Sequence, residues 1–410
     1  MISLEALQKD GFLEGRDLTD FPQCAKDRVE FDKVNPARRA ILQKAADRFL
    51  KIASTAMLAG VNDFCAQNQN WLDHYSMYCH LTEKYNQINW TQWSKPLRFC
   101  DPKAIQAEFN RHQQDINRIK ILQYFFYRQW QNLKKYANNK GVRIIGDIPI
   151  YVAHDSADVW GNQELFKLDE AGHMTVQSGC PPDFFKETGQ LWGHPIYDWT
   201  AHESTEFSWW LARISYIYKM VDIIRIDHFN GFAKYWEVPA MDKNGLNGYW
   251  MQAPGEKLLD KLMKELGKQP ILAENLGEAA PDVEPLLKKF GIPGMKVLQM
   301  SFGNSDNPAE MDSSNVVYTG THDNDTTVGW FRTGAGQANR QTKTVIDLER
   351  KQVLDVLGFD GSKIHWDMIK LALNSPADIA IIPMQDILGL DSRARMNTPG
   401  TVGQLTLIHI

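Results

Sequence analysis

Residues 221–229 read VDIIRIDHF, and isoleucine and valine occupy both odd and even positions of this stretch, so both faces of a strand formed by it would be apolar. A strand that is apolar on both faces is typical of a parallel sheet covered on both sides. Further runs share this texture and end in acidic or small polar residues: VRIIGDIPIYV from Val142, PILAENLG from Pro270, GMKVLQM from Gly294, NVVYTGTHDND from Asn315 and DIAIIPMQDIL from Asp378. We therefore predict a series of buried parallel strands.

Helical segments separate these runs, among them STEFSWWLARISYIYKM, GEKLLDKLMKELG and DVEPLLKKFG. Alternating strands and helices indicate an α/β protein, either a doubly wound sheet or a β/α barrel. No GxGxxG or GxxxxGK[ST] motif follows a predicted strand, which argues against a nucleotide-binding sheet. The pattern thus favours a (β/α)8 TIM-type barrel. Chemistry in such barrels lies at the carboxyl ends of the strands, where the sequence places Asp147, Asp227, Glu274 and Asp323.

The chain has a second texture before the strands begin. Apolar residues recur three and four apart in ARRAILQKAADRFLKIA and in INRIKILQYFFYRQWQNLKKYA, which predicts helices. We expect an N-terminal remnant leading into the barrel at residues 1–35, a helical insertion subdomain at 36–140 and the catalytic barrel core at 141–410.

Composition excludes several classes of protein. Hydrophobic residues make up 43% and charged residues 23% of the 410, an ordinary globular mixture, and a net charge of −5 argues against a nucleic-acid partner. The five cysteines form no CxxC pair, which predicts neither a disulfide framework nor a zinc site and fits a cytoplasmic location. No apolar run reaches membrane-spanning length. An aromatic content of 11% suits a carbohydrate site, although most aromatic residues are expected in the core.

Two carboxylates carry the candidate chemistry. Arg225 and Asp227 are two apart on one strand and share a face, so the arginine should lower the pKa of the aspartate, as a nucleophile requires. Glu274 follows three apolar residues, and a dry environment near another negative charge should raise its pKa. A structural ion pair and a surface or helix-capping acid are the alternative interpretations.

Asp323 lies in THDND at the end of another predicted strand, beside His322. This is not an EF-hand loop, since the sixth position is not glycine and the twelfth is Gly334, so no metal is expected there. One ionised and one protonated carboxylate across a glycosidic bond are the minimum requirement for sugar transfer. Three acids on separate strand ends favour this interpretation.

Specific motifs extend the argument over nearly the whole chain: RIIGDIPIYVAHDSADVW, SGCPPDFFKETGQLWGHPIYDW, IIRIDHFNGF, YWEVPA, ILAENLG, GIPGMKVLQMSF, VVYTGTHDNDTT and RMNTPGT. With them the chain resembles the 4-α-glucanotransferases of the amylomaltase or disproportionating type, relatives of the α-amylase barrel enzymes. The resemblance implies that Asp227 is the nucleophile, Glu274 the general acid/base and Asp323 a third carboxylate that favours ring distortion. It also implies a donor-sugar subsite with four further side chains: Arg225, His228, His322 and, in support, Asp147.

The segment PPDFFKETGQLW resembles the lid loop of this family, which implies glucan contacts at Asp183, Glu187, Gln190 and Trp192. The implied reaction moves α-1,4-glucan segments between malto-oligosaccharides by double displacement with retention of configuration. The two carboxyl groups should then lie roughly 5 to 5.5 Å apart. No organic cofactor or metal is expected.

The ends of the chain depart from this resemblance. Relatives carry two barrel strands upstream of the part that matches ISLEALQKDGFL, and they continue beyond NTPGT with a tryptophan-containing stretch and a helix. We therefore expect a chain truncated at both ends and an incomplete barrel with strands three to eight present. Such a sheet would keep two open edges, which leaves the activity of this chain open.

Two other functions stay open at this point. An amylase-like α-glucan hydrolase would use the same carboxylates with water as acceptor, and a catalytically dead glucan-binding fragment would keep the aromatic residues without turnover.

Overall fold

The computed structural model describes residues 2–19, 21–25, 29–182, 188–277, 280–302, 311–333, 343–358 and 360–399. The chain divides into two compact units. The first, called the helical unit, comprises Met1–Ile144 and Val152–His173, and the second, called the sheet unit, comprises Ile145–Tyr151 and Met174–Ile410. The domain limits expected at residues 35 and 140 stay a prediction.

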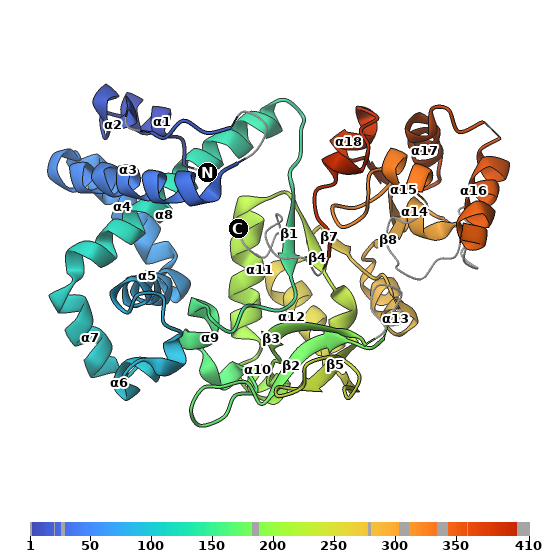
Figure 1. The fold of residues 1–410 in the computed structure, drawn as a ribbon. Coiled ribbons are helices and arrows are strands. Elements are labelled where there is room, and N and C mark those ends of the chain that lie inside the picture. Colours follow the sequence, from blue (N-terminus) through green and yellow to red (C-terminus); the bar gives the residue numbers. More distant parts are fainter. Residues whose placement is uncertain are drawn as a thin grey trace. The chain divides into compact units, whose positions relative to one another are not determined.

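The helical unit, coloured blue to green in Figure 1, confirms the helical character predicted from the apolar periodicity. Its elements are α1 (Leu4–Lys9), α2 (Gly15–Thr19), α3 (Phe31–Ile52), α4 (Thr55–Gln67), α5 (Gln69–Lys84), the 3-10 turn η1 (Trp90–Gln92), α6 (Lys95–Arg98), α7 (Pro102–Arg111), α8 (Gln113–Asn139), α9 (Ala157–Gly161) and η2 (Gln163–Leu165). Short polar residues begin several of these helices. The Asp101 side chain accepts a hydrogen bond from the Ala104 amide, and Pro102 occupies the first turn of α7, where its missing N–H is not needed.

Three phenylalanines form the centre of the helical unit. Phe12, Phe49 and Phe125 are at most 1% exposed, and their ring centroids lie 5.1 to 5.4 Å apart. They come from the segment after α1, from α3 and from α8. The first residues of the chain therefore pack in one core with the long helices that follow them.

The sheet unit is built on a six-stranded parallel sheet in the order β1-β4-β7-β8-β9-β10. The strands are β1 (Ile145–Pro149), β4 (Ile223–Asp227), β7 (Ile271–Ala273), β8 (Gly294–Val297), β9 (Asn315–Tyr318) and β10 (Ile379–Ile381). All the predicted runs contain one of these strands, which confirms the parallel sheet. The strands are shorter than the runs, because α14 (Leu298–Ser301) follows β8 at once and α18 (Met384–Ile387) begins soon after β10.

Helices lie between the strands, as predicted for α11 (Ser208–Met220), α12 (Gly255–Leu266) and α13 (Ala280–Phe290), and α11 packs against both β4 and α12. The remaining helical elements are α10 (Trp199–Ser204), η3 (Phe229–Phe232), α15 (Thr327–Thr333), α16 (Lys343–Leu357), α17 (Ile364–Leu373) and η4 (Ser392–Ala394). β7 is wholly buried, whereas β1 and β10, the two ends of the sheet within the described residues, are partly exposed. The fold is thus mixed α/β with a parallel half-barrel sheet.

A second sheet was not predicted. It is antiparallel, in the order β3-β2-β5-β6, and consists of β2 (Val176–Cys180), β3 (Gln190–Pro195), β5 (Lys234–Pro239) and β6 (Tyr249–Gln252) (Figure 1). Glycine at position 179 allows β2 and β3 to approach closely, since a Cβ there would lie 2.2 Å from the Gln190 carbonyl oxygen. The motif YWEVPA forms most of β5 and therefore has a structural place in this sheet.

Within the described part of the chain, no helix has both the length and the apolarity required for crossing a membrane.

The phenylalanine cluster leads to a stability prediction. Phe125→Ala should lower the free energy of unfolding of the helical unit by about 3 to 5 kcal/mol, because it leaves a cavity between packed rings. Leu133→Ala on the same helix is the control: Leu133 is 53% exposed, so the change should stay within roughly 0.5 kcal/mol. Guanidinium titration followed by circular dichroism measures both. Equal losses in the two variants would contradict the assigned core.

Candidate active site

A buried arginine links the carboxyl ends of β1 and β4. Arg225 lies opposite Asp147 in the strand register. Its Nη1 donates hydrogen bonds to both Asp147 oxygens, each at 2.7 Å, and to Asp227 Oδ1 at 3.0 Å. Its Nε contacts the Met295 sulfur at 3.4 Å. The predicted shared face of Arg225 and Asp227 is confirmed, and the Asp227 side chain, 44% exposed, can be reached from solvent.

Burial and charge act in opposite directions on this group of residues. Burial alone would lower the pKa of Arg225, but the surrounding carboxylates raise it above its ordinary value, so the guanidinium stays charged. Burial raises the pKa of Asp147 even though the pairing with Arg225 opposes that shift. The arginine is therefore a permanent positive charge that the nearby carboxylates share.

Glu274 lies beside Asp227, since Ile226 and Ala273 pair in the ladder between β4 and β7 and each acid follows directly. Its Oε2 accepts a hydrogen bond from the His228 amide at 2.8 Å, and its Oε1 accepts one from the Leu276 amide at 3.0 Å. Burial, and then the charge of Asp227, raise the pKa of Glu274 to about 7. The predicted direction of this shift is confirmed.

His228 adopts a left-handed backbone conformation with φ of 53°, which is uncommon for a residue other than glycine. This turn directs its amide toward Glu274. Burial lowers the pKa of its imidazole to about 4, so the ring is neutral at physiological pH. The centroid of the ring lies 4.7 Å from that of Trp192, in a T-shaped arrangement, and 6.4 Å from that of Tyr151.

The loop after β9 contributes the third acid. Asp323 Oδ1 accepts a hydrogen bond from Asn397 Nδ2, and its backbone oxygen accepts one from Arg395 at 2.6 Å. His322 Nε2 lies 3.3 Å from Asp323 Oδ2. His322 also acts electrostatically on Asp147, which places this loop at the same end of the sheet as Arg225.

Only part of the expected lid can be placed. Gln190 and Trp192 lie on β3, where Trp192 Nε1 donates a hydrogen bond to Gln190 Oε1 at 3.4 Å. Trp192 reaches the site through its contact with His228. Asp183 and Glu187 lie outside the described residues, and their glucan contacts stay a prediction.

Four side chains in this arrangement were not predicted: Tyr151, Met295, Arg395 and Asn397. Arg395 and Asn397 belong to the motif RMNTPGT, so a polar residue within a specific motif was the available signal. Tyr151 and Met295 also lie in quoted motifs, but aromatic and sulfur-containing residues near strand ends are ordinary core residues, so their residue types gave no signal.

The arrangement defines a class of protein. An arginine-paired carboxylate and a buried carboxyl that can hold a proton near neutral pH sit at the ends of neighbouring parallel strands. This combination is typical of barrel enzymes that act on glycosidic bonds, where one acid gives a proton and the other faces the anomeric carbon.

Comparisons with known proteins give the family. The sequence profile of the 4-alpha-glucanotransferase family matches residues 1–406. The 4-alpha-glucanotransferase of Synechocystis sp. is 42% identical over 98% of this chain and 79% of its own length, and that of Streptococcus pneumoniae is 39% identical over 98% and 78%. This chain belongs to the 4-alpha-glucanotransferase family.

Solved structures agree. The amylomaltase of Streptococcus agalactiae in complex with acarbose superposes with a TM-score of 0.89 at 34% identity, covering 98% of this chain and 80% of that one. The amylomaltase of Corynebacterium glutamicum, at 18% identity and a TM-score of 0.74, shows the fold alone. The comparisons do not support the expected truncation of both ends.

The charge of Asp227 should be measurable in the pKa of its neighbour. Asp227→Asn removes one of the two causes that raise the pKa of Glu274, so this pKa should fall below about 7. Carbon-13 NMR of labelled glutamate, assigned with Glu274→Gln, measures the shift. Asp323→Asn, which removes an acid with other partners, should change it less. An unchanged Glu274 pKa in Asp227→Asn would show that the two carboxyls do not interact.

Proposed function

We propose that this chain transfers α-1,4-glucan segments between malto-oligosaccharides by a retaining double displacement. The observation that carries the proposal is the pairing of Asp227, held by Arg225, with Glu274, whose pKa is raised to about 7. A catalyst that first gives and later takes the same proton is most effective when its pKa lies near the working pH.

In the first step, an Asp227 oxygen attacks the anomeric carbon while Glu274 donates its proton to the leaving glycosidic oxygen. The glucosyl group is then bonded to Asp227 and the leaving glucan carries the proton. In the second step, Glu274 removes a proton from the 4-hydroxyl of an acceptor sugar, which displaces Asp227. Two inversions at the same carbon leave the configuration unchanged.

Other residues of the site assist the proposed reaction. Asp323 binds sugar hydroxyls, with its carboxylate oriented by Asn397. The donor sugar contacts Arg225, His228 and His322, with Asp147 in support through its pairing with Arg225. Four residues contact the glucan from the lid side: Asp183, Glu187, Gln190 and Trp192. In this proposal Glu274 is the acid and the base and Asp227 is the nucleophile, without an organic cofactor.

We also propose a position for the parallel sheet within a larger barrel. The six parallel strands correspond to strands three to eight of an eight-stranded barrel, which the sequential order of the sheet and the greater exposure of β1 and β10 support. A cytoplasmic location rests on the cysteine pattern alone.

Product analysis on maltotriose tests the function. We expect glucose together with a ladder of longer maltodextrins at a constant number of glycosidic bonds, and Asp227→Asn should reduce the rate by roughly 10³-fold or more because it removes the nucleophile. A net loss of glycosidic bonds would indicate a hydrolase. Maltodextrin binding with a rate no higher than that of Asp227→Asn would indicate a glucan-binding fragment.

The pH dependence follows from the acid. Because the pKa of Glu274 is about 7, its proton is present below that pH and is lost above it. The kcat/KM for maltotriose should therefore fall as the pH rises through 7, approaching about tenfold per pH unit on the alkaline limb.

Initial rates between pH 5.5 and 9 would give this profile. A maltosyl fluoride donor is the control, since its leaving group needs no proton and the alkaline decline of its first step should disappear. A profile for maltotriose that stays flat up to pH 9 would remove Glu274 from the role of acid.

A further inference from the structure

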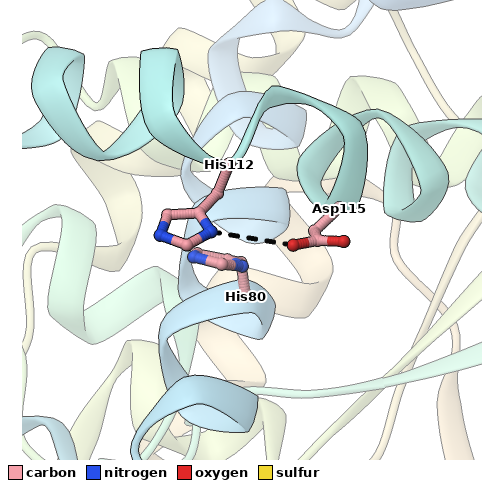
Figure 2. Close-up of side chains that lie close together, drawn as sticks. All are labelled: His80, His112 and Asp115. Carbon is pink, nitrogen blue, oxygen red and sulfur yellow. Dashed lines mark ion pairs between the residues drawn. The ribbon is translucent and has the colours of Figure 1, made fainter.

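A second cluster of ionisable side chains lies in the helical unit, at the corner where α7 ends and α8 begins (Figure 2). His80 lies near the carboxyl end of α5, His112 caps both α7 and α8, and Asp115 lies in the first turn of α8. One ring nitrogen from each histidine and one oxygen of Asp115 lie within 4.8 Å of one another. All three belong to the same compact unit.

Glu108 orients the two imidazole rings from one side. Its Oε1 is 3.1 Å from His80 Nε2 and 3.5 Å from His112 Nε2, and Lys84 donates to the same oxygen. Glu108 is 5% exposed and can only accept hydrogen bonds as a carboxylate, so His80 carries its proton on Nε2. The lone pair of a neutral His80 is therefore on Nδ1.

A dashed line in Figure 2 marks the second contact of His112, whose Nδ1 lies 3.7 Å from Asp115 Oδ2. Asp115 Oδ1 is already bonded to Arg118 at 2.6 Å. With the Nε2 of His112 turned to Glu108, its Nδ1 meets a second carboxylate oxygen. A neutral imidazole carries a proton on only one nitrogen, so the other nitrogen of His112 would turn its lone pair toward a carboxylate oxygen. A cation relieves this repulsion, either as a second proton on the imidazole or as a metal ion.

The geometry fits a small transition-metal ion. Ligands about 2.0 to 2.1 Å from a tetrahedral zinc ion lie about 3.3 Å from one another, close to the 3.7 Å between His112 Nδ1 and Asp115 Oδ2. The side chains of His112 and Asp115 are 29% and 46% exposed, so they can rotate toward the nearly buried His80. Solvent can reach the ion through these two residues and supply the fourth ligand.

The surrounding residues support the same ligand set. Histidine ligands of metals commonly donate their other ring N–H to a carboxylate, which fixes the tautomer, and Glu108 occupies this place for His80. Two imidazoles and one carboxylate suit zinc and related divalent ions, whereas calcium takes six to eight oxygen ligands.

We propose that His80, His112 and Asp115 bind a divalent transition-metal ion of the zinc type, which ties the end of α5 to the corner between α7 and α8. The site is structural and lies in the helical unit, so it is independent of the proposed transfer reaction. It was missed in the sequence because His80 lies on a different helix from His112 and Asp115 and no ligand is a cysteine.

The test uses the full chain without a histidine tag, after chelator treatment and dialysis. Isothermal titration with zinc chloride should give one site per chain, and zinc should raise the temperature of unfolding. His112→Ala and Asp115→Asn should each weaken zinc binding at least about tenfold. Both side chains are partly exposed, so circular dichroism should show that these variants stay folded.

His173→Ala is the matched control. His173 also faces an aspartate four residues away in the helical unit, with Nδ1 3.5 Å from Asp169 Oδ2, but among the described residues this pair belongs to no group of three metal-ligating side chains. Zinc binding should be unchanged in this variant. Zinc binding to the wild type that is absent, unaffected by His112→Ala, or equally weakened by His173→Ala would overturn the proposal and assign the cluster to proton-bridged ion pairs.

Discussion

The ion pairs of Arg225 are the constraint on which the sheet unit depends. A buried guanidinium must be matched by negative charge, and here Asp147 and Asp227 supply it from two adjacent strands. Glu274 adds a third carboxyl to the same region. Burial, and then the charge of Asp227, raise the pKa of Glu274 to about 7, although the charge of Arg225 opposes this shift. The raised pKa of Glu274 is thus a consequence of its burial together with the charge of its neighbour Asp227.

The backbone moderates this effect. The amides of His228 and Leu276 donate to the two oxygens of Glu274 and favour its ionised form, against burial and the charge of Asp227. The left-handed turn at His228 brings one of these amides into place. Arg225 lowers the pKa of Glu274 more than these amides do, and all three oppose burial and the charge of Asp227. A pKa near 7 therefore reflects a balance of opposing effects, which suits the role proposed for Glu274 as both acid and base.

The sequence predicted those features whose signal is local. Strand β4 and the acids after β4 and β7 could be found, because a two-sided apolar run followed by a carboxylate is visible in one short segment. The antiparallel sheet could not, since β2 pairs with a strand that lies far away in the sequence and neither has a long alternating pattern. The contacts of Asn397 with Asp323 and of His80 with the α7–α8 corner have the same cause: only tertiary packing brings these residues together.

This missed sheet has a direct part in the site. Trp192 on β3 packs against the imidazole of His228, and Tyr151 lies near the same ring. Aromatic side chains therefore contact His228, whose amide donates a hydrogen bond to Glu274. Burial of the imidazole keeps it neutral, which avoids a further positive charge that would lower the pKa of Glu274. The Asp227 side chain nevertheless remains 44% exposed, so water can still reach this carboxylate. In the proposed transfer, an acceptor sugar that stacks on Trp192 gains binding energy that water lacks, so the glucosyl group on Asp227 reacts with the sugar in preference to water.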